Sequence, residues 1–292
     1  RPVFAGIRLH PEFSHDTLSR IMRKLFYFFV CLLLFWAAGC GEEKTAGPEP
    51  AVRFYSASSA ASHLLLKLGA ADALAAVDRY GRAVPGAERI PVAGSGSAVS
   101  IEKLAELGVS RAFVWYYQTN LKQLLEQHGI AVTVLPAVRL ADYPGLVRTV
   151  ASAAGKNAEG EALIAEFQTQ LDATPPAGGE RRRVYFELYS PYKCAGGDSY
   201  FGDLLKLAGA ENIGEALPTG PVSPEYLVQS SPEVILFLAE TESAETIAGR
   251  PGFAALPAVR YGRIHRVERT RVLEGVDPAE AVRYLRRLIR DR

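Results

Sequence analysis

The sequence predicts an α/β protein of two similar lobes, because patterns in its first half return in the same order in its second half. A Leu-Leu-Lys-Leu run that leads into glycine and alanine occurs at residues 65–70 and returns at residues 204–210. A Ser-x-Glu-x-Leu pattern begins at Ser100 and again at Ser223. Repeated patterns in one order indicate two copies of one helix-and-strand plan.

A strand is expected at the same offset after each Ser-x-Glu pattern, with a helix in between. Short apolar runs at residues 112–115 and 235–238 are typical of buried strands. A third pair of segments follows at residues 128–132 and 261–265. Because small molecules commonly bind in clefts between domains, we expect a ligand cleft between the two lobes.

The first lobe is expected over residues 51–140, with a strand at 52–56 and a helix at 62–69 that ends in a glycine. Small hydroxyl residues, among them Ser58 and Ser59, lie between the strand and the helix. Hydroxyl and backbone N–H groups at a helix N-terminus can bind a ligand. They can equally well cap the helix without any ligand, so both interpretations stay open.

Residues 141–173 are expected to join the lobes as a helical segment, because apolar residues recur three and four apart within residues 162–171. The helical pattern is interrupted near residues 155–157. A Pro- and Gly-rich stretch ends this segment, and the second lobe is expected over residues 174–292. Its last helix should begin after Asp277, which is followed by proline.

An export signal precedes the lobes. Met22 is followed by two basic residues, an apolar run and a Gly-Cys pair, so residues 22–39 have the layout of a signal peptide. The four residues that end at Cys40 resemble the bacterial lipoprotein cleavage box, in which the cysteine is lipidated. An uncleaved anchor, or cleavage without a lipid, are the alternatives. Residues 1–21 precede the only methionine and are expected to be an upstream extension outside the fold.

Residues 40–50 are polar and turn-rich and are expected to form a flexible tether. Lipid chains contribute roughly 0.8 kcal/mol per buried methylene to membrane binding. The protein is therefore expected to be exported and anchored to a membrane on its periplasmic or extracellular side.

The composition narrows the possible partners. The 33 basic residues nearly balance the 32 acidic ones, so the charge does not indicate a nucleic-acid surface. We also expect the protein to be a monomer. Cys31 lies in the predicted signal and Cys40 is the candidate lipidation site, which leaves Cys194 and predicts no internal disulfide. We interpret Cys194 as a small buried side chain, with a ligand-contacting or redox thiol as the alternative.

Catalytic and metal motifs are not indicated. His63, His128 and His265 do not suggest a shared zinc or manganese site. The sequence has no Gly-x-Ser-x-Gly, His-Glu-x-x-His or matched Cys/His arrangement. A hydrolase is therefore disfavoured, and we expect no catalytic residue, no metal site and no intrinsic cofactor.

The second lobe carries four further motifs, which are Asp198-Ser199-Tyr200-x-x-Asp203-Leu204-Leu205, Gly209-x-x-Asn212-Ile213, Val222-Ser223-Pro224-Glu225 and Ala258-Val259-x-x-Gly262-Arg263-Ile264. Together with the Ser-x-Glu pattern and the strand that ends in Trp115, the chain resembles the substrate-binding proteins of bacterial importers for cobalamin, ferric siderophores and haem. The resemblance implies two α/β lobes bridged by one long helix, a shallow cleft and small opening motions. Residues 108–111 depart from the family's frequent Lys-Pro-Asp.

Glu102 and Glu225 occupy equivalent places in the two Ser-x-Glu patterns. An acidic residue in the first helical turn is favoured by the helix dipole by about 0.3–1 kcal/mol, which explains both residues without a partner. The resemblance adds that one glutamate of each lobe contacts arginines of the ABC permease. We therefore expect Glu102 and Glu225 to mark the docking face.

Aromatic residues offer surface for a large flat or polycyclic ligand. By resemblance, Trp115 falls where cobalamin binders place a pocket tryptophan. Arg269, Arg271 and Glu274 precede the last helix, a region that faces ligand in the family. Arginines there suit an anionic ferric siderophore better than a neutral corrinoid. The alternative is that these three side chains are simply solvated surface charges. The expected ligand-contacting residues are Ser58, Ser59, Tyr80, Trp115, Tyr116, Tyr192, Tyr200 and Arg271.

These observations predict a lipid-anchored substrate-binding component of an ABC importer. Its transported ligand is expected to be cobalamin, another corrinoid or a ferric siderophore, which it delivers to the permease. The alternatives are a binder of haem or another metal chelate, and a sensor or scaffold lipoprotein with the same fold.

Overall fold

The structure is a computed structural model that describes residues 52–137, 139–173 and 181–291. The chain divides into two compact units, residues 1–50 and 51–292, and the described residues belong to the second. The predicted extension, signal peptide, lipidation site Cys40 and tether lie outside the described residues. Within the described part, no helix combines the length and the apolar character needed to cross a membrane.

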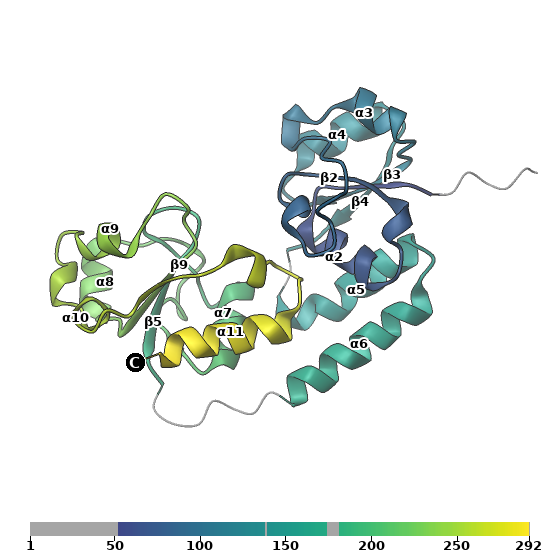
Figure 1. The fold of residues 1–292 in the computed structure, drawn as a ribbon. Coiled ribbons are helices and arrows are strands. Elements are labelled where there is room, and N and C mark those ends of the chain that lie inside the picture. Colours follow the sequence, from purple (N-terminus) through teal and green to yellow (C-terminus); the bar gives the residue numbers. More distant parts are fainter. Residues whose placement is uncertain (1–51, 138, 174–180, 292) are drawn as a thin grey trace, which may run out of the picture. The chain divides into compact units, whose positions relative to one another are not determined.

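The first sheet has four parallel strands in the order β2-β1-β3-β4 (Figure 1). Helices connect the strands, as parallel neighbours require. The strands are β1 (Phe54–Ser56), β2 (Leu74–Val77), β3 (Arg111–Trp115) and β4 (Ala131–Leu135). The helices are α2 (Ser59–Lys67), α3 (Ile101–Glu106) and α4 (Thr119–Gln127), with 3₁₀ turns η1 (Ala71–Ala73), η2 (Gly81–Ala83) and η3 (Gly96–Ala98).

The second sheet has the order β10-β9-β5-β6-β8, and β7 also pairs with β5. Strands β10, β9, β5 and β7 are parallel, whereas β6 is antiparallel to its neighbours β5 and β8. The strands are β5 (Arg183–Glu187), β6 (Lys193–Cys194), β7 (Glu211–Asn212), β8 (Gly220–Pro221), β9 (Val234–Phe237) and β10 (Ile264–Arg266). The helices are α7 (Tyr200–Ala208), α8 (Pro224–Ser230), α9 (Ala244–Ala248), α10 (Pro257–Arg260) and α11 (Pro278–Arg290), with η5 (Phe253–Ala255) and η6 (Arg269–Arg271).

The repeated sequence patterns form equivalent elements, which confirms the predicted α/β class. The Leu-Leu-Lys-Leu runs end α2 and α7, and each helix is followed by a glycine of positive φ, Gly69 at 69° and Gly209 at 85°. Ser100 and Ser223 are the N-caps of α3 and α8, since each hydroxyl accepts a hydrogen bond from a backbone N–H three residues on.

The linking segment contains two helices, α5 (Tyr143–Ala153) and the longer α6 (Asn157–Asp172), preceded by η4 (Leu140–Asp142). The break falls where the sequence predicts an interruption, at Gly155, whose φ is +66°. The two helices pack on each other (Figure 1). The centres of the Tyr143 and Phe167 rings lie 4.5 Å apart, and Arg148 Nε lies 2.7 Å from Glu161 Oε1.

The lobes share one apolar core. Phe54 and Phe113 of the first sheet belong to the same buried cluster as Val184 and Phe186 of the second, together with residues of α2, α5, α6, α7 and α11. The opposite face of each sheet has its own core. Alternating residues of each strand therefore face the shared core on one side of the sheet and that sheet's own core on the other side.

A smaller apolar cluster also joins the lobes. Val84 and Ala87 of the first lobe pack with Leu273 and Val276 of the second. The lobes are thus held together by more than the linking helices.

Candidate functional site

Several polar and aromatic side chains follow the carboxyl ends of parallel strands. Asp78 follows β2, Tyr116 and Tyr117 follow β3, Tyr189 lies just beyond β5, and Arg269 lies just beyond β10. Ligands of open α/β sheets bind outside the carboxyl ends of the strands. This location makes these residues the first candidates for a binding site.

Arg269 brings the two lobes together at this location. Its guanidinium carbon lies 4.4 Å from the centre of the Tyr80 ring of the first lobe and 4.9 Å from the centre of the Tyr189 ring of the second. Both distances are within the range of cation–π attraction. One side chain therefore bridges aromatic rings that are far apart in the sequence.

Tyr117 and Tyr189 belong to the same group, although they remain 64% and 44% exposed. Partial burial raises the pKa of each hydroxyl, and the charge of Glu274 raises it further, whereas Arg269 opposes the shift. Each hydroxyl therefore responds to the charges of both Glu274 and Arg269. We call Tyr80, Tyr117, Tyr189, Arg269 and Glu274 the inter-lobe cluster.

Two carboxyl groups, those of Asp78 and Glu274, interact electrostatically with Arg269. Burial raises the pKa of Glu274, and the charge of Arg269 partly opposes this. Burial also raises the pKa of Asp78, whose Oδ1 accepts a hydrogen bond from the Gly81 N–H at 2.6 Å. Neither carboxylate forms an ion pair with Arg269 among those found in the described chain.

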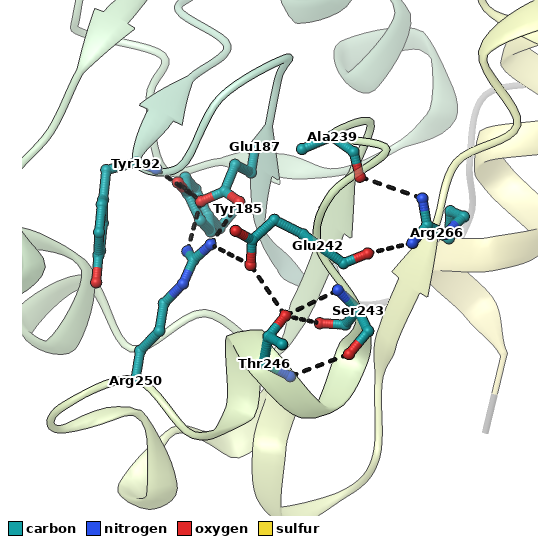
Figure 2. Close-up of polar contacts among 9 residues, drawn as sticks. All are labelled: Tyr185, Glu187, Tyr192, Ala239, Glu242, Ser243, Thr246, Arg250 and Arg266. Atoms are coloured by element: carbon teal, nitrogen blue, oxygen red, sulfur yellow. Dashed lines mark hydrogen bonds and ion pairs between the residues drawn. The ribbon is translucent and has the colours of Figure 1, made fainter.

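A buried ionic network supports the loop that carries Tyr189. Glu187 ends β5, is fully buried, and accepts hydrogen bonds from Arg250 at 2.6 and 2.8 Å (Figure 2). Its Oε2 also accepts hydrogen bonds from the Tyr185 hydroxyl and the Tyr192 N–H, both at 2.8 Å. A buried carboxylate needs such saturation to remain charged at low cost.

Arg250 extends the network. Its Nη2 lies 3.1 Å from Glu242 Oε2, and its guanidinium lies 4.7 Å from the centre of the Tyr192 ring (Figure 2). Tyr192 has a φ of +61°, which is unusual for a residue with a bulky side chain. The hydrogen bond from its N–H to Glu187 holds it in this conformation. Glu187 and Arg250 therefore fix the loop between β5 and β6.

Ser58 and Ser59, which are expected to contact ligand, lie at the N-terminus of α2. Ser58 is fully buried and is the N-cap of α2, and its hydroxyl accepts the Ala61 N–H at 3.2 Å. Ser59 is the first residue of α2 and is half-buried. The Ser58 hydroxyl is therefore occupied by the helix cap.

The aromatic residues that are expected to contact ligand differ in how exposed they are to solvent. Trp115 is 8% exposed and belongs to the shared core, whereas Tyr116 is 54% exposed and packs edge-on against Tyr117 at 5.3 Å. Tyr200, which is among the expected ligand contacts, is the first residue of α7 and is 1% exposed. Its ring packs against Phe201 instead.

Arg271 faces a different part of the molecule from Arg269. Its Nη2 lies 2.5 Å from Glu280 Oε1, and its guanidinium lies 4.1 Å from the centre of the Tyr284 ring. It lines a pocket of about 380 Å³ between α2 and the start of α11, together with His63, Leu66, Lys67, Pro85, Thr270, Val276, Asp277 and Glu280. Burial and the charge of Lys67 lower the pKa of His63 to about 4, against the charge of Asp277.

The sequence interpretation missed Tyr189 and left Tyr117 out of the expected ligand contacts. A signal existed, because Tyr189 directly follows the strand expected at residues 184–188, just as Tyr116 and Tyr117 follow the strand at residues 112–115. The pairing of Tyr189 with Tyr80 through Arg269 has no local signal.

Glu102 and Glu225 are both exposed in the first turn of their helices. Glu102 also receives a hydrogen bond from the Ser100 hydroxyl at 3.1 Å. Backbone and Ser100 hydrogen bonds lower the pKa of Glu102, so it is ionised at neutral pH. Each lobe therefore presents a negative charge at an equivalent place.

Cys194 is fully buried, and burial raises the pKa of its thiol to about 12, with a smaller contribution from Glu187. It is therefore a thiol rather than a reactive thiolate. Throughout the described ranges, no group of three or more His, Cys, Asp and Glu side chains is arranged to hold a metal ion.

Comparison with known proteins identifies the family. The family model described as periplasmic binding protein matches residues 56–269. The chain belongs to this family, whose relatives are binding proteins rather than enzymes. The cobalamin-binding protein of Halobacterium salinarum is 27% identical over 196 residues, which cover 63% of this chain and 53% of that protein. The chain thus spans about half the length of this curated relative.

Solved structures share the fold. The apo haem-binding protein RhuT of Roseiflexus sp. RS-1 has a TM-score of 0.72 at 21% identity, covering 82% of this chain and 98% of that one. The haem-binding protein HutB of Vibrio cholerae has a TM-score of 0.68 at 23% identity, covering 83% and 100%. The vitamin B12 binding protein BtuF of Vibrio cholerae has a TM-score of 0.66 at 18% identity, covering 83% and 98%. The predicted resemblance is confirmed.

Proposed function

We propose that the chain is the substrate-binding component of an ABC importer and binds a macrocyclic metal chelate at the inter-lobe cluster. The observation that carries this proposal is that the Arg269 guanidinium contacts the ring of Tyr80 from one lobe and the ring of Tyr189 from the other. The cobalamin-binding relative supports a corrinoid as the ligand. Haem and ferric siderophores are the further candidates.

The aromatic residues supply the binding energy of this proposal. A buried aromatic ring covers about 150–250 Å². At the usual area coefficient this contributes on the order of 4–6 kcal/mol per ring, before ordering costs are subtracted. Tyr80, Tyr117 and Tyr189 would together hold a flat or polycyclic ligand tightly.

We also propose that Glu102 and Glu225 dock the protein on its permease. Both are exposed at equivalent helix starts, as a pseudo-symmetric partner would require. Lipidation at Cys40, and with it a membrane anchor outside the cytoplasm, belongs to the same proposal and follows from the sequence alone.

A binding screen tests the proposal. The purified full chain is titrated by equilibrium dialysis with cyanocobalamin, haem and ferric siderophores of the hydroxamate and catecholate types, with detergent present throughout. Saturable binding of one of these supports the proposed function. No saturable binding of any of them contradicts it.

A further inference from the structure

Basic side chains gather at one end of the second lobe. Arg182 directly precedes β5 and Arg263 directly precedes β10, so both lie at the amino edge of the parallel strands. Arg182 Nη1 donates to the carbonyl oxygen of Ile289, in the last turn of α11, at 2.7 Å, which places the end of this helix at the same edge (Figure 1). Arg286 Nη2 donates to the Leu207 carbonyl, near the end of α7, at 2.8 Å. We call Arg181, Arg182, Lys206, Arg263, Arg286 and Arg290 the basic face.

The positive charge of the basic face is only partly opposed. Arg182 and Arg286 are held by carbonyl oxygens, which carry no net charge. Burial lowers the pKa of Arg286, and the charge of Arg290 lowers it further, as expected for neighbouring like charges. Two acidic residues adjoin the face, since the Glu211 N–H donates to the Arg182 carbonyl and the Asp291 carbonyl accepts from Arg182. The basic residues outnumber them.

Neighbouring arginines that pair with glutamates do not belong to the basic face. Arg183 lies 3.6 Å from Glu233, and Arg287 lies 3.3 Å from Glu280. Helix dipoles favour the basic residues in the last turns of α7 and α11, whereas Arg181 belongs to no helix. The basic face therefore carries positive charge beyond these ion pairs and helix ends.

We propose that the basic face binds the anionic phospholipid headgroups of a membrane. A basic side chain close to an anionic bilayer strengthens binding by about fivefold. The planar guanidinium fork also matches phosphate oxygens. The inter-lobe cluster follows the carboxyl ends of the strands, whereas the basic face lies at the amino edge of the second sheet. Membrane contact through this face therefore leaves the cluster uncovered.

The sequence favours a membrane over other polyanions. The predicted signal peptide directs the chain out of the cytoplasm and so away from nucleic acids. The predicted tether, residues 40–50, spans at most about 40 Å when fully extended, so the bilayer lies within reach of the lobes. The choice of partner rests on this predicted export and anchoring, whereas the basic face belongs to the described residues.

Vesicle sedimentation tests this. The full chain carries Cys40→Ser, so that no lipid can be attached, and is mixed with vesicles of phosphatidylcholine alone or of phosphatidylcholine with phosphatidylglycerol. The test variant adds Arg181→Gln with Lys206→Gln. The matched control adds Arg82→Gln with Arg89→Gln, which removes the same charge from exposed positions of the first lobe. The predicted signal peptide is the same in every protein, so its own membrane binding cancels in the comparison.

At about 0.1 M salt, the test variant should bind the anionic vesicles at least about tenfold more weakly than the parent, and the control should stay within about twofold. All three proteins should bind the neutral vesicles equally. If the double variant does not fold, Lys206→Gln alone carries the test, with Arg82→Gln as its control, and should weaken anionic binding at least about threefold.

A parent protein that does not prefer the anionic vesicles overturns the inference. Equal weakening in the test variant and the control also overturns it, because net charge rather than the basic face would then determine binding. Unchanged binding of the test variant does the same. None of these measurements uses a transported ligand, so their failure leaves the proposed function intact.

Discussion

The guanidinium of Arg139 holds the carboxylate of Asp203 with two hydrogen bonds, of 2.8 Å from Nε and 2.5 Å from Nη2. The Leu140 N–H donates to the same carboxylate at 3.0 Å, and Arg139 also donates to the Gly197 carbonyl at 3.1 Å. The end of the first lobe is thereby tied to α7 of the second. Together with the shared core, this contact limits relative motion of the lobes.

Replacing Asp203 with Asn should lower the free energy of unfolding by about 1 kcal/mol, because the pair is partly exposed to water. Burial alone would raise the pKa of Asp203, but hydrogen bonds from Arg139 and Leu140 lower it below its usual range. A lowered folded-state pKa stabilises the protein above the unfolded pKa, and this stability is lost as the pH falls through the folded value. Urea titrations between pH 6 and pH 2.5 should show a smaller acid loss in Asp203→Asn. An equal loss in both proteins would contradict this.

Arg250→Met should destabilise the protein by about 3–5 kcal/mol, because it leaves Glu187 charged and fully buried without its partner. The double variant Glu187→Leu with Arg250→Met should recover most of this loss. Thermal and urea unfolding measure both effects. The exposed Arg260→Met serves as the control, and a loss no larger than that of the control would argue against the network.

The free energy of unfolding should rise with pH between about pH 4 and 6.5, because His63 has a lower pKa in the folded protein than in the unfolded chain. Burial and Lys67 lower its pKa to about 4 in the folded protein, so the unfolded chain binds more protons in this range. The contribution amounts to about 2–3 kcal/mol across the interval. The free energy of unfolding, measured at pH 4.5 and pH 7, should change less in His63→Gln than in the wild type. Identical changes would show that His63 is not the titrating group.

Reversing both charges, Glu102→Lys with Glu225→Lys, should abolish permease-dependent uptake while ligand affinity stays within about twofold, because neither residue belongs to the inter-lobe cluster. Glu106→Lys with Glu215→Lys changes the net charge equally at other exposed positions and is the matched control. Uptake assays in membranes that contain the permease measure the difference. Undiminished uptake by the first variant would remove the docking assignment.

Local patterns explain why the fold could be predicted. The N-caps at Ser100 and Ser223 and the glycines after α2 and α7 act within a few residues, so the sequence reveals them directly. The break between α5 and α6 follows from the same kind of signal at Gly155. The wholly apolar strands are equally visible, but they do not show which face packs against which core.

The site depends on contacts between distant residues and was predicted only in part. Trp115 lies on the same strand face as Phe113, two residues earlier, and so enters the shared core. Glu187 resembles an ordinary charged residue in the sequence, because its partner Arg250 lies 63 residues away. Arg269 was singled out by its position, but only the folded chain places it against both Tyr80 and Tyr189.

The most direct test of the proposed binding site compares dissociation constants of the wild type, the Tyr80→Ala with Tyr189→Ala double variant, and the control Tyr261→Ala. Tyr261 is 62% exposed and stacks on Arg263, outside the inter-lobe cluster. With the ligand found in the binding screen, the double variant should bind at least about thirtyfold more weakly, and Tyr261→Ala should bind like the wild type. Unchanged affinity in a folded double variant would show that the ligand binds elsewhere.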